Sequence, residues 1–151
     1  METVLREVLP NLWVSDADSA SVISDTFGDI DLVLDCTGRD KPRRNLLNVR
    51  PTGSTSHSWT VEDLDEIVHL VKAKRQFERK VLIHCQSGRS RSTCAAAAVL
   101  LALGLEKTVT RAIDRTKIPG TNVNTQSLGG LKKWWGAKLR ERQISLFEEA
   151  S

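Results

Sequence analysis

The stretch Val81 to Ser92, which reads Val-Leu-Ile-His-Cys-Gln-Ser-Gly-Arg-Ser-Arg-Ser, decides the fold of this chain. The segment Lys80 to His84, which includes its first four residues, is apolar enough to predict a buried strand. Its end opens an alanine-rich run from Ser92 to Leu103, which predicts a helix that Gly104 would terminate. Cys85 therefore stands at the end of a strand, at the head of a loop that leads into a helix. This arrangement suits a thiolate nucleophile inside a phosphate-binding loop.

The chemistry of such a loop assigns a role to each of its residues. A cysteine must be ionised to displace a phosphoryl group, and a free thiol has a pKa of about 8.5. We expect backbone N–H groups and the positive end of the following helix to favour an anion at one point in the loop. The predicted phosphate-binding residues are Gln86, Ser87, Gly88, Arg89, Ser90 and Arg91. Gly88 would allow a backbone conformation closed to other residues.

Two further residues complete the predicted reaction. The planar guanidinium of Arg91 can hold two phosphate oxygens while the phosphorus becomes five-coordinate. Ser92 is placed to donate a hydrogen bond to the sulfur when the thiolate leaves in the second step. The expected course is attack by Cys85, a cysteinyl-phosphate intermediate and then hydrolysis.

The rest of the chain alternates between strand and helix patterns, with no internal repeat. The predicted strands lie in Glu7–Ser15, Ile30–Cys36 and Leu46–Val49, and the predicted helices are Ala17–Phe27, Thr60–Phe77, Glu106–Lys117 and one from Asn124 or Thr125 toward Glu149. This order argues for an α/β fold with a central, mostly parallel sheet flanked by helices. A length of 151 residues fits a single domain covering residues 1–151.

Composition limits the possible partners and compartments. The longest apolar run, Cys94 to Leu103, is too short to span a membrane, so no membrane contact is expected. A net charge of +3 leaves a nucleic-acid partner possible but not indicated. Met1 to Val4 lacks the start of a secretory signal, and three cysteines match neither a disulfide framework nor a zinc site. We therefore expect a cytoplasmic or nuclear protein without metal or organic cofactor.

A known family shares this pattern. His84 to Ser92 resembles the His-Cys-x-x-Gly-x-x-Arg-Ser/Thr signature of cysteine-dependent protein phosphatases, and its Ser-Arg-Ser ending looks like the small, atypical dual-specificity branch. Three weaker similarities follow in the same order and spacing as in that branch: Asn11–Ser15, Ala98–Leu101 and Ile118–Asn124.

The resemblance implies the cysteine-phosphatase fold and hydrolysis of phosphotyrosine and phosphoserine or phosphothreonine in proteins. It makes Cys85, Arg91 and Ser92 the catalytic residues. It gives His84 a supporting role through hydrogen bonding near the loop. Asn124 matches a family position that braces the loop, although an N-cap of the last helix explains this residue equally well.

The clearest departure from the family is a missing general acid. The family usually supplies an aspartate from the loop ahead of the long helix, whereas Arg50 to Ser58 carries no carboxylate. Another residue would then act as acid, or the substrate has a good leaving group such as an aryl phosphate or a phosphoanhydride, or the protein turns over slowly and mainly binds. The alternative acids are His57, Asp40, Glu62, Asp63 and Asp65. Simpler explanations exist for these groups, and we hypothesise that none matches the usual acid.

Several other residues are compatible with more than one class of substrate. Arg89 either faces solvent or attracts a substrate with several phosphates, such as a phosphoinositide or an RNA 5′ end, and the basic run Arg39 to Arg50 could line the same side. A phosphate-binding pseudophosphatase adaptor is the non-enzymatic alternative. Cys36 and Cys94 are most simply small buried apolar residues, although a disulfide with Cys85 under oxidation is possible.

Overall fold

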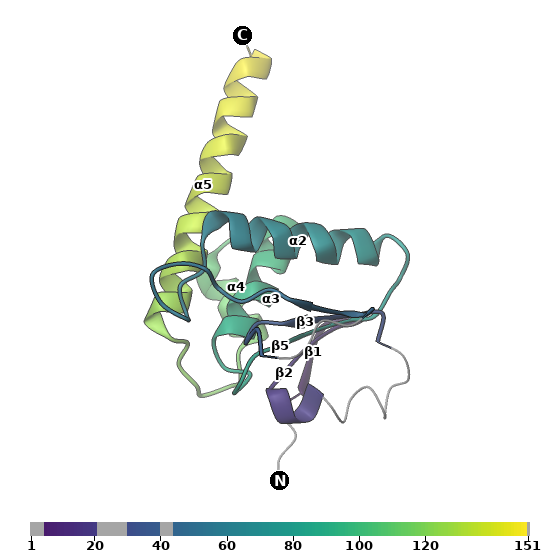
Figure 1. Ribbon diagram of the computed structural model, residues 1–151. Coiled ribbons are helices and arrows are strands. Elements are labelled where there is room, and N and C mark those ends of the chain that lie inside the picture. The colour runs from purple at the N-terminus through teal and green to yellow at the C-terminus, as the bar shows by residue number, and fades with distance from the viewer. Residues whose placement is uncertain (1–4, 21–29, 40–43, 151) are drawn as a thin grey trace.

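The computed structural model of the chain describes residues 5–20, 30–39 and 44–150 (Figure 1). Its centre is a five-stranded sheet in the order β1-β2-β5-β3-β4. The strands are β1 (Leu5–Leu9), β2 (Leu12–Ser15), β3 (Leu32–Asp35), β4 (Leu46–Asn48) and β5 (Val81–His84). Only β1 and β2 pair antiparallel, as a hairpin, and every other pairing is parallel. The expected mostly parallel sheet is therefore confirmed.

Four helices cover one face of the sheet (Figure 1). They are α2 (Val61–Arg75), α3 (Arg91–Ala102), α4 (Val109–Thr116) and α5 (Thr125–Ala150). Residues 17–20 form a helical turn on the opposite side, and the remainder of the helix expected there lies outside the described residues. The helix expected from Glu106 begins later because the Thr108 side chain accepts the N–H of Arg111 and so caps the helix at that point.

Helix α3 forms the middle of the core. Its residues from Ser92 to Leu101 are all buried, because the run of alanines lets the helix lie close to the sheet and its neighbouring helices. The central strand β5 is buried along its whole length. On the other face of the sheet, a second, smaller cluster contains Trp13, Ile30, Val33, Leu46 and Leu82. The segment that joins β5 to α3 is thus held between two rigid elements.

Helices α2 and α5 contact each other on the helical side of the sheet. Thr60 and Asp63 form the expected capping box at the start of α2, each side chain bonded to the other's backbone N–H. Helix α5 runs past Gly136, as expected, and its far end projects beyond the body of the domain (Figure 1). None of the helices described here is both long and apolar enough to cross a membrane.

The parallel strands decide where a site can form. Strands β3, β4 and β5 run in the same direction, so the loops that follow their carboxyl ends meet at one edge of the sheet. Those loops begin at Cys36, Val49 and Cys85, respectively. Ligands of open α/β sheets bind at such an edge.

Candidate active site

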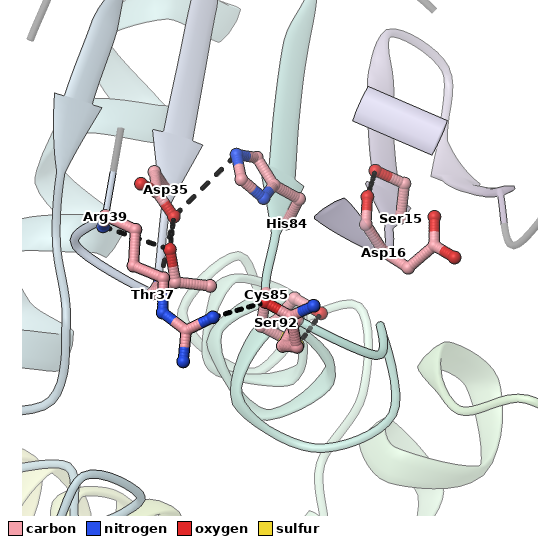
Figure 2. A network of polar contacts seen from close by, with 9 residues as sticks. Ser15, Asp16, Asp35, Thr37, Arg39, His84, Cys85 and Ser92 are labelled. Atoms are coloured by element: carbon pink, nitrogen blue, oxygen red, sulfur yellow. Dashed lines mark hydrogen bonds and ion pairs between the residues drawn. The ribbon is translucent and has the colours of Figure 1, made fainter. Parts of the chain in front are cut away.

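The Sγ of Cys85 lies at the end of β5, 3.1 Å from the Oγ of Ser92 in the first turn of α3 (Figure 2). Both residues are buried, and Cys85 is 2% exposed. The backbone N–H of Cys85 donates to the carbonyl of Ser15 on the neighbouring strand. The structure therefore brings together the predicted nucleophile and the predicted hydrogen-bond donor to its sulfur.

Gly88, in the middle of the loop, has a φ of +70°, the left-handed conformation that the sequence predicts there. Its carbonyl accepts hydrogen bonds from Arg6 Nη2, at 3.0 Å, and from the hydroxyl of Thr93, at 3.4 Å. Two donors that lie outside the loop, the Arg6 guanidinium and the Thr93 hydroxyl, thus stabilise its bend.

Arg6, on β1, was missed by sequence reasoning. Its Nε donates to the carbonyl of Thr116 at 2.8 Å, and its Nη2 also donates to Thr93 Oγ1 at 3.2 Å. Burial lowers the pKa of Arg6, and the proximity of Cys85 opposes that shift. The Arg6 guanidinium therefore lies next to the loop and is hydrogen-bonded both to α4 and to the carbonyl of Gly88. No local signal marks it, because Arg6 and Gly88 are 82 positions apart in the sequence.

Ser90 and Asn124 join the loop to the start of α5. The backbone N–H of Asn124 donates to Ser90 Oγ at 2.8 Å. The side-chain Oδ1 of Asn124 accepts the N–H groups of Gln126 and Ser127 at the start of α5. Asn124 thus contacts the loop through its backbone and caps the helix through its side chain, so both sequence interpretations describe part of its geometry.

His84 and Asp35 form a buried pair beneath the loop, with Nε2 and Oδ1 3.8 Å apart (Figure 2). Asp35 Oδ1 also accepts hydrogen bonds from the backbone N–H and the hydroxyl of Thr37, at 2.8 and 2.6 Å. Arg39, two residues further along, donates from Nη1 to Gln86 Oε1 at 3.1 Å. These contacts connect the loop after β3 to the loop after β5.

The remaining predicted loop residues differ in exposure. Gln86, Ser87 and Arg89 are exposed, and the Arg89 side chain makes no hydrogen bond or ion pair within the described part of the chain. Arg91 is half-buried and lines a cavity of about 370 Å³ together with Arg50 and the loop that follows it. Of the basic run, Arg39 and Arg50 thus lie beside the predicted site. Arg44 precedes β4 and lines a separate cavity with Asp31 and Arg79.

Two carboxylates proposed as acids are engaged elsewhere. Asp63 accepts from the N–H and the hydroxyl of Thr52 as well as from the N–H of Thr60. Burial alone would raise the pKa of Asp63, but these hydrogen bonds outweigh it and lower the pKa. Asp65 accepts from Trp134 Nε1 at 2.9 Å and pairs with the ammonium of Lys138 at 2.7 Å. Both carboxylates thus already accept hydrogen bonds from other groups.

The other candidate acids are no better placed. Glu62 is an exposed first-turn residue of α2, and Asp40 lies outside the described residues. Asp16, which is not one of those candidates, has a carboxylate that points away from Cys85 (Figure 2) and accepts the N–H of Ser19. In residues 5–20, 30–39 and 44–150, no carboxylate lines the cavity beside Arg91.

His57 lies in the loop after β4, and its carbonyl accepts the hydroxyl of Ser127 at 3.0 Å. Burial and the nearby charge of Arg91 lower the pKa of His57, so the ring is neutral at pH 7. A neutral imidazole is a poor proton donor. His57 is thus close to the predicted site but in the wrong protonation state for an acid.

Cys36 and Cys94 are free, fully buried thiols, as expected of small apolar residues. Burial and the neighbouring Cys85 raise the pKa of both thiols. Both therefore remain protonated. Within the described ranges, no group of three or more His, Cys, Asp or Glu side chains is arranged to hold a metal ion.

Comparison with known proteins identifies solved structures of the same fold. Among solved structures, human DUSP28 superposes with a TM-score of 0.76 at 17% identity, over 92% of this chain and 97% of that one. A mouse putative dual specificity phosphatase complexed with zinc tungstate gives a TM-score of 0.77 at 19% identity, over 94% and 92%. DUSP15 gives 0.73 at 20% identity, over 97% of both chains. These likenesses establish the fold. No curated protein sequence matches the chain.

The family described as dual specificity phosphatase, catalytic domain matches residues 12–122. That range includes the strand, loop and first helical turn that surround Cys85, and it covers most of the 151 residues. The chain therefore belongs to the dual specificity phosphatase catalytic-domain family.

Proposed function

We propose that this chain hydrolyses phosphate monoesters through a cysteinyl-phosphate intermediate formed on Cys85. The observation that carries the proposal is the 3.1 Å contact between Cys85 Sγ and Ser92 Oγ, at the junction of β5 and α3. Arg91 is the first residue of α3 and lies beside that junction. Family membership supports a phosphatase, and the three free thiols support a reducing compartment such as the cytoplasm or the nucleus.

The proposed reaction has two steps. The Cys85 thiolate attacks the phosphorus, an S–P bond forms, and the ester P–O bond breaks. Arg91 holds the equatorial oxygens in both steps. Water then attacks the phosphorus and the S–P bond breaks, while the hydroxyl of Ser92 donates a hydrogen bond to the departing sulfur.

Phosphotyrosine and phosphoserine or phosphothreonine of proteins are the substrates that family resemblance favours. A phenol has a pKa of about 10, so a tyrosine oxygen leaves more readily without an acid than a serine oxygen does. We expect aryl phosphates to react faster than alkyl phosphates at this site.

The test is hydrolysis of p-nitrophenyl phosphate by the wild-type chain and by Cys85→Ser. We expect activity that vanadate inhibits and that Cys85→Ser abolishes, while Cys94→Ala, which changes a buried thiol in the same helix, retains it. Absence of hydrolysis by wild type together with tight phosphopeptide binding would instead support a phosphate-binding adaptor.

A further inference from the structure

The cavity of about 370 Å³ beside the phosphate loop is where a leaving group would lie. Its size is in the range of small-molecule sites. The residues that line it are Thr37, Arg50, Pro51, Thr52, Gly53, Thr55, Ser56 and Arg91. Because Arg91 would hold the phosphoryl group, whatever is attached to that group extends into this cavity.

The lining is cationic. Arg50 and Arg91 both reach the cavity, no carboxylate lines it, and neither arginine has an ion-pair partner in residues 5–20, 30–39 and 44–150. No aromatic side chain is present to hold a phenyl ring. Two unpaired guanidinium groups in one small cavity favour an anionic ligand.

Most of the hydroxyl groups in the lining already donate elsewhere. Thr37 donates to Asp35 at 2.6 Å, Thr52 donates to Asp63 at 2.7 Å, and Thr55 donates to Gln126 at 2.9 Å. The cavity is therefore less suited to a neutral alcohol than to an anion. The principal donors left for a ligand are the two guanidinium groups.

Arg50 is an exposed residue whose aliphatic part packs against the loop after β3. Gly38 has a φ of +70°, and a Cβ added there would lie 2.9 Å from Arg50 Cδ. The aliphatic part of Arg50 thus lies directly over Gly38. Two hydrogen bonds hold the loop that follows Arg50, because the Gly53 N–H donates to the Ser58 carbonyl and the Ser127 hydroxyl donates to the His57 carbonyl.

The missing acid has a chemical consequence. An alkoxide leaving group is about as basic as hydroxide, the conjugate base of water with its pKa of about 15.7, and it needs a proton to leave. A phosphate leaving group, whose second pKa is about 6, is stable as an anion and needs none. What such a group requires is a cation at the departing oxygen, and Arg50 lies in the leaving-group cavity.

We propose that the preferred leaving group is itself a phosphate, so that the chain hydrolyses the terminal phosphoanhydride bond of a polyphosphate substrate. This inference rests on the proposed cysteinyl-phosphate reaction. The Cys85 thiolate attacks the terminal phosphorus, the S–P bond forms, and the bridging P–O bond breaks. The electron pair stays on the bridging oxygen of the departing phosphate, which Arg50 binds. Water then displaces the sulfur, giving orthophosphate, a regenerated thiolate and a proton released to solvent.

The experiment measures orthophosphate release from inorganic tripolyphosphate, and turnover of p-nitrophenyl phosphate and phosphoserine, all in EDTA. We expect tripolyphosphate to be hydrolysed at least as fast as the aryl ester and far faster than phosphoserine. Arg50→Gln should lower kcat/KM for tripolyphosphate by roughly 10- to 100-fold and for p-nitrophenyl phosphate less than about threefold. Arg50→Lys should recover part of the loss. Arg111→Gln, an exposed arginine on α4 away from the cavity, should change neither rate.

A parallel assay with ATP identifies the source of the polyphosphate. Formation of ADP with the same dependence on Arg50 supports a substrate carried on a nucleoside, and hydrolysis of tripolyphosphate alone supports an inorganic one. Cys85-dependent hydrolysis of p-nitrophenyl phosphate without hydrolysis of either polyphosphate would overturn this inference and leave the proposed function standing. Equal losses on tripolyphosphate and p-nitrophenyl phosphate in Arg50→Gln would overturn the leaving-group role of Arg50. Failure on every substrate would refute the proposed function itself.

Discussion

Arg6 Nη2 donates a hydrogen bond of 3.0 Å to the carbonyl of Gly88, which links the first strand to the bend of the predicted phosphate-binding loop. The same nitrogen reaches Thr93 in α3, and Nε reaches Thr116 in α4. One guanidinium thus fixes the loop relative to two helices. The Arg6 guanidinium also lies close enough to Cys85 for the two groups to interact electrostatically, which raises the pKa of Arg6 against the effect of its burial.

Arg6→Gln should therefore impair both stability and turnover. Loss of charge-assisted hydrogen bonds to acceptors on the buried residues Gly88, Thr93 and Thr116 costs about 1–3 kcal/mol of unfolding free energy. We also expect kcat/KM for p-nitrophenyl phosphate to fall about tenfold, a loss of about 1.4 kcal/mol in transition-state stabilisation. Urea unfolding and steady-state kinetics measure the two effects. Arg75→Gln, which removes a contact with the carbonyl of Pro10 on another surface, is the control. A lower unfolding free energy with an unchanged kcat/KM would show that the role of Arg6 is purely structural.

Ser92→Ala should slow the second step more than the first, because the hydroxyl stabilises the departing sulfur. A hydrogen bond to a charged group is worth about 1.5–3 kcal/mol, so kcat should fall by roughly 10- to 100-fold. Rapid mixing with p-nitrophenyl phosphate should then show a burst of nitrophenol, and mass spectrometry after acid quench should show the phosphorylated protein. Ser92→Thr keeps the hydroxyl and should turn over without accumulation. An equally slow variant that shows no burst would place the role of Ser92 in the first step.

The pKa of His57 should respond to an anion bound at Arg91. Burial and the charge of Arg91 lower this pKa, so NMR titration of the ring should give a value below the usual figure of about 6.5. Tungstate should raise it by neutralising Arg91. The chain contains only three histidines, which simplifies the assignment. A titration that is identical with and without tungstate would show that no anion binds next to His57.

The same shift predicts a pH dependence of stability. Because the folded state disfavours the charged ring, the unfolded chain binds this proton more readily. The contribution of His57 is fully present above about pH 6.5 and is lost as the pH falls from there through the lower pKa of the folded state. His57→Gln should reduce this loss in urea unfolding measured across pH 5–7. A steeper loss in the variant than in wild type would contradict the sign.

Two neighbouring glycines in α5 should respond oppositely to alanine. A Cβ at Gly130 would lie 2.6 Å from the carbonyl oxygen of Trp59, a backbone atom that cannot move away. Gly130→Ala should lower the unfolding free energy by about 1–3 kcal/mol. A Cβ at Gly129 meets nothing within 4 Å, so Gly129→Ala should raise it by up to about 1 kcal/mol through helix propensity. Equal effects in urea unfolding would show that α5 does not pack closely on Trp59.

The local pattern of the sequence determined the elements and the shape of the loop. The apolar run before Cys85, the alanines after Ser92 and Gly88 between them predict a strand, a helix and a bend with positive φ, and the structure contains all three. These features depend on residues a few positions apart, whose backbone preferences and periodicity act locally. The α/β class follows from the order of such segments along the chain.

Only the tertiary structure decided which distant groups surround that loop. Arg6 reaches Gly88 because β1 pairs with β2, which lies next to β5, and no local pattern encodes that strand order. Arg50 reaches the cavity beside Arg91 because parallel strands end at one edge of the sheet. Asp63, a candidate acid by position in the chain, instead accepts hydrogen bonds from Thr52 and Thr60. Contacts that close long loops depend on strand order and register. The sequence alone therefore predicted the nucleophile and the phosphate-binding loop, whereas the folded chain determined which charged side chains lie around them.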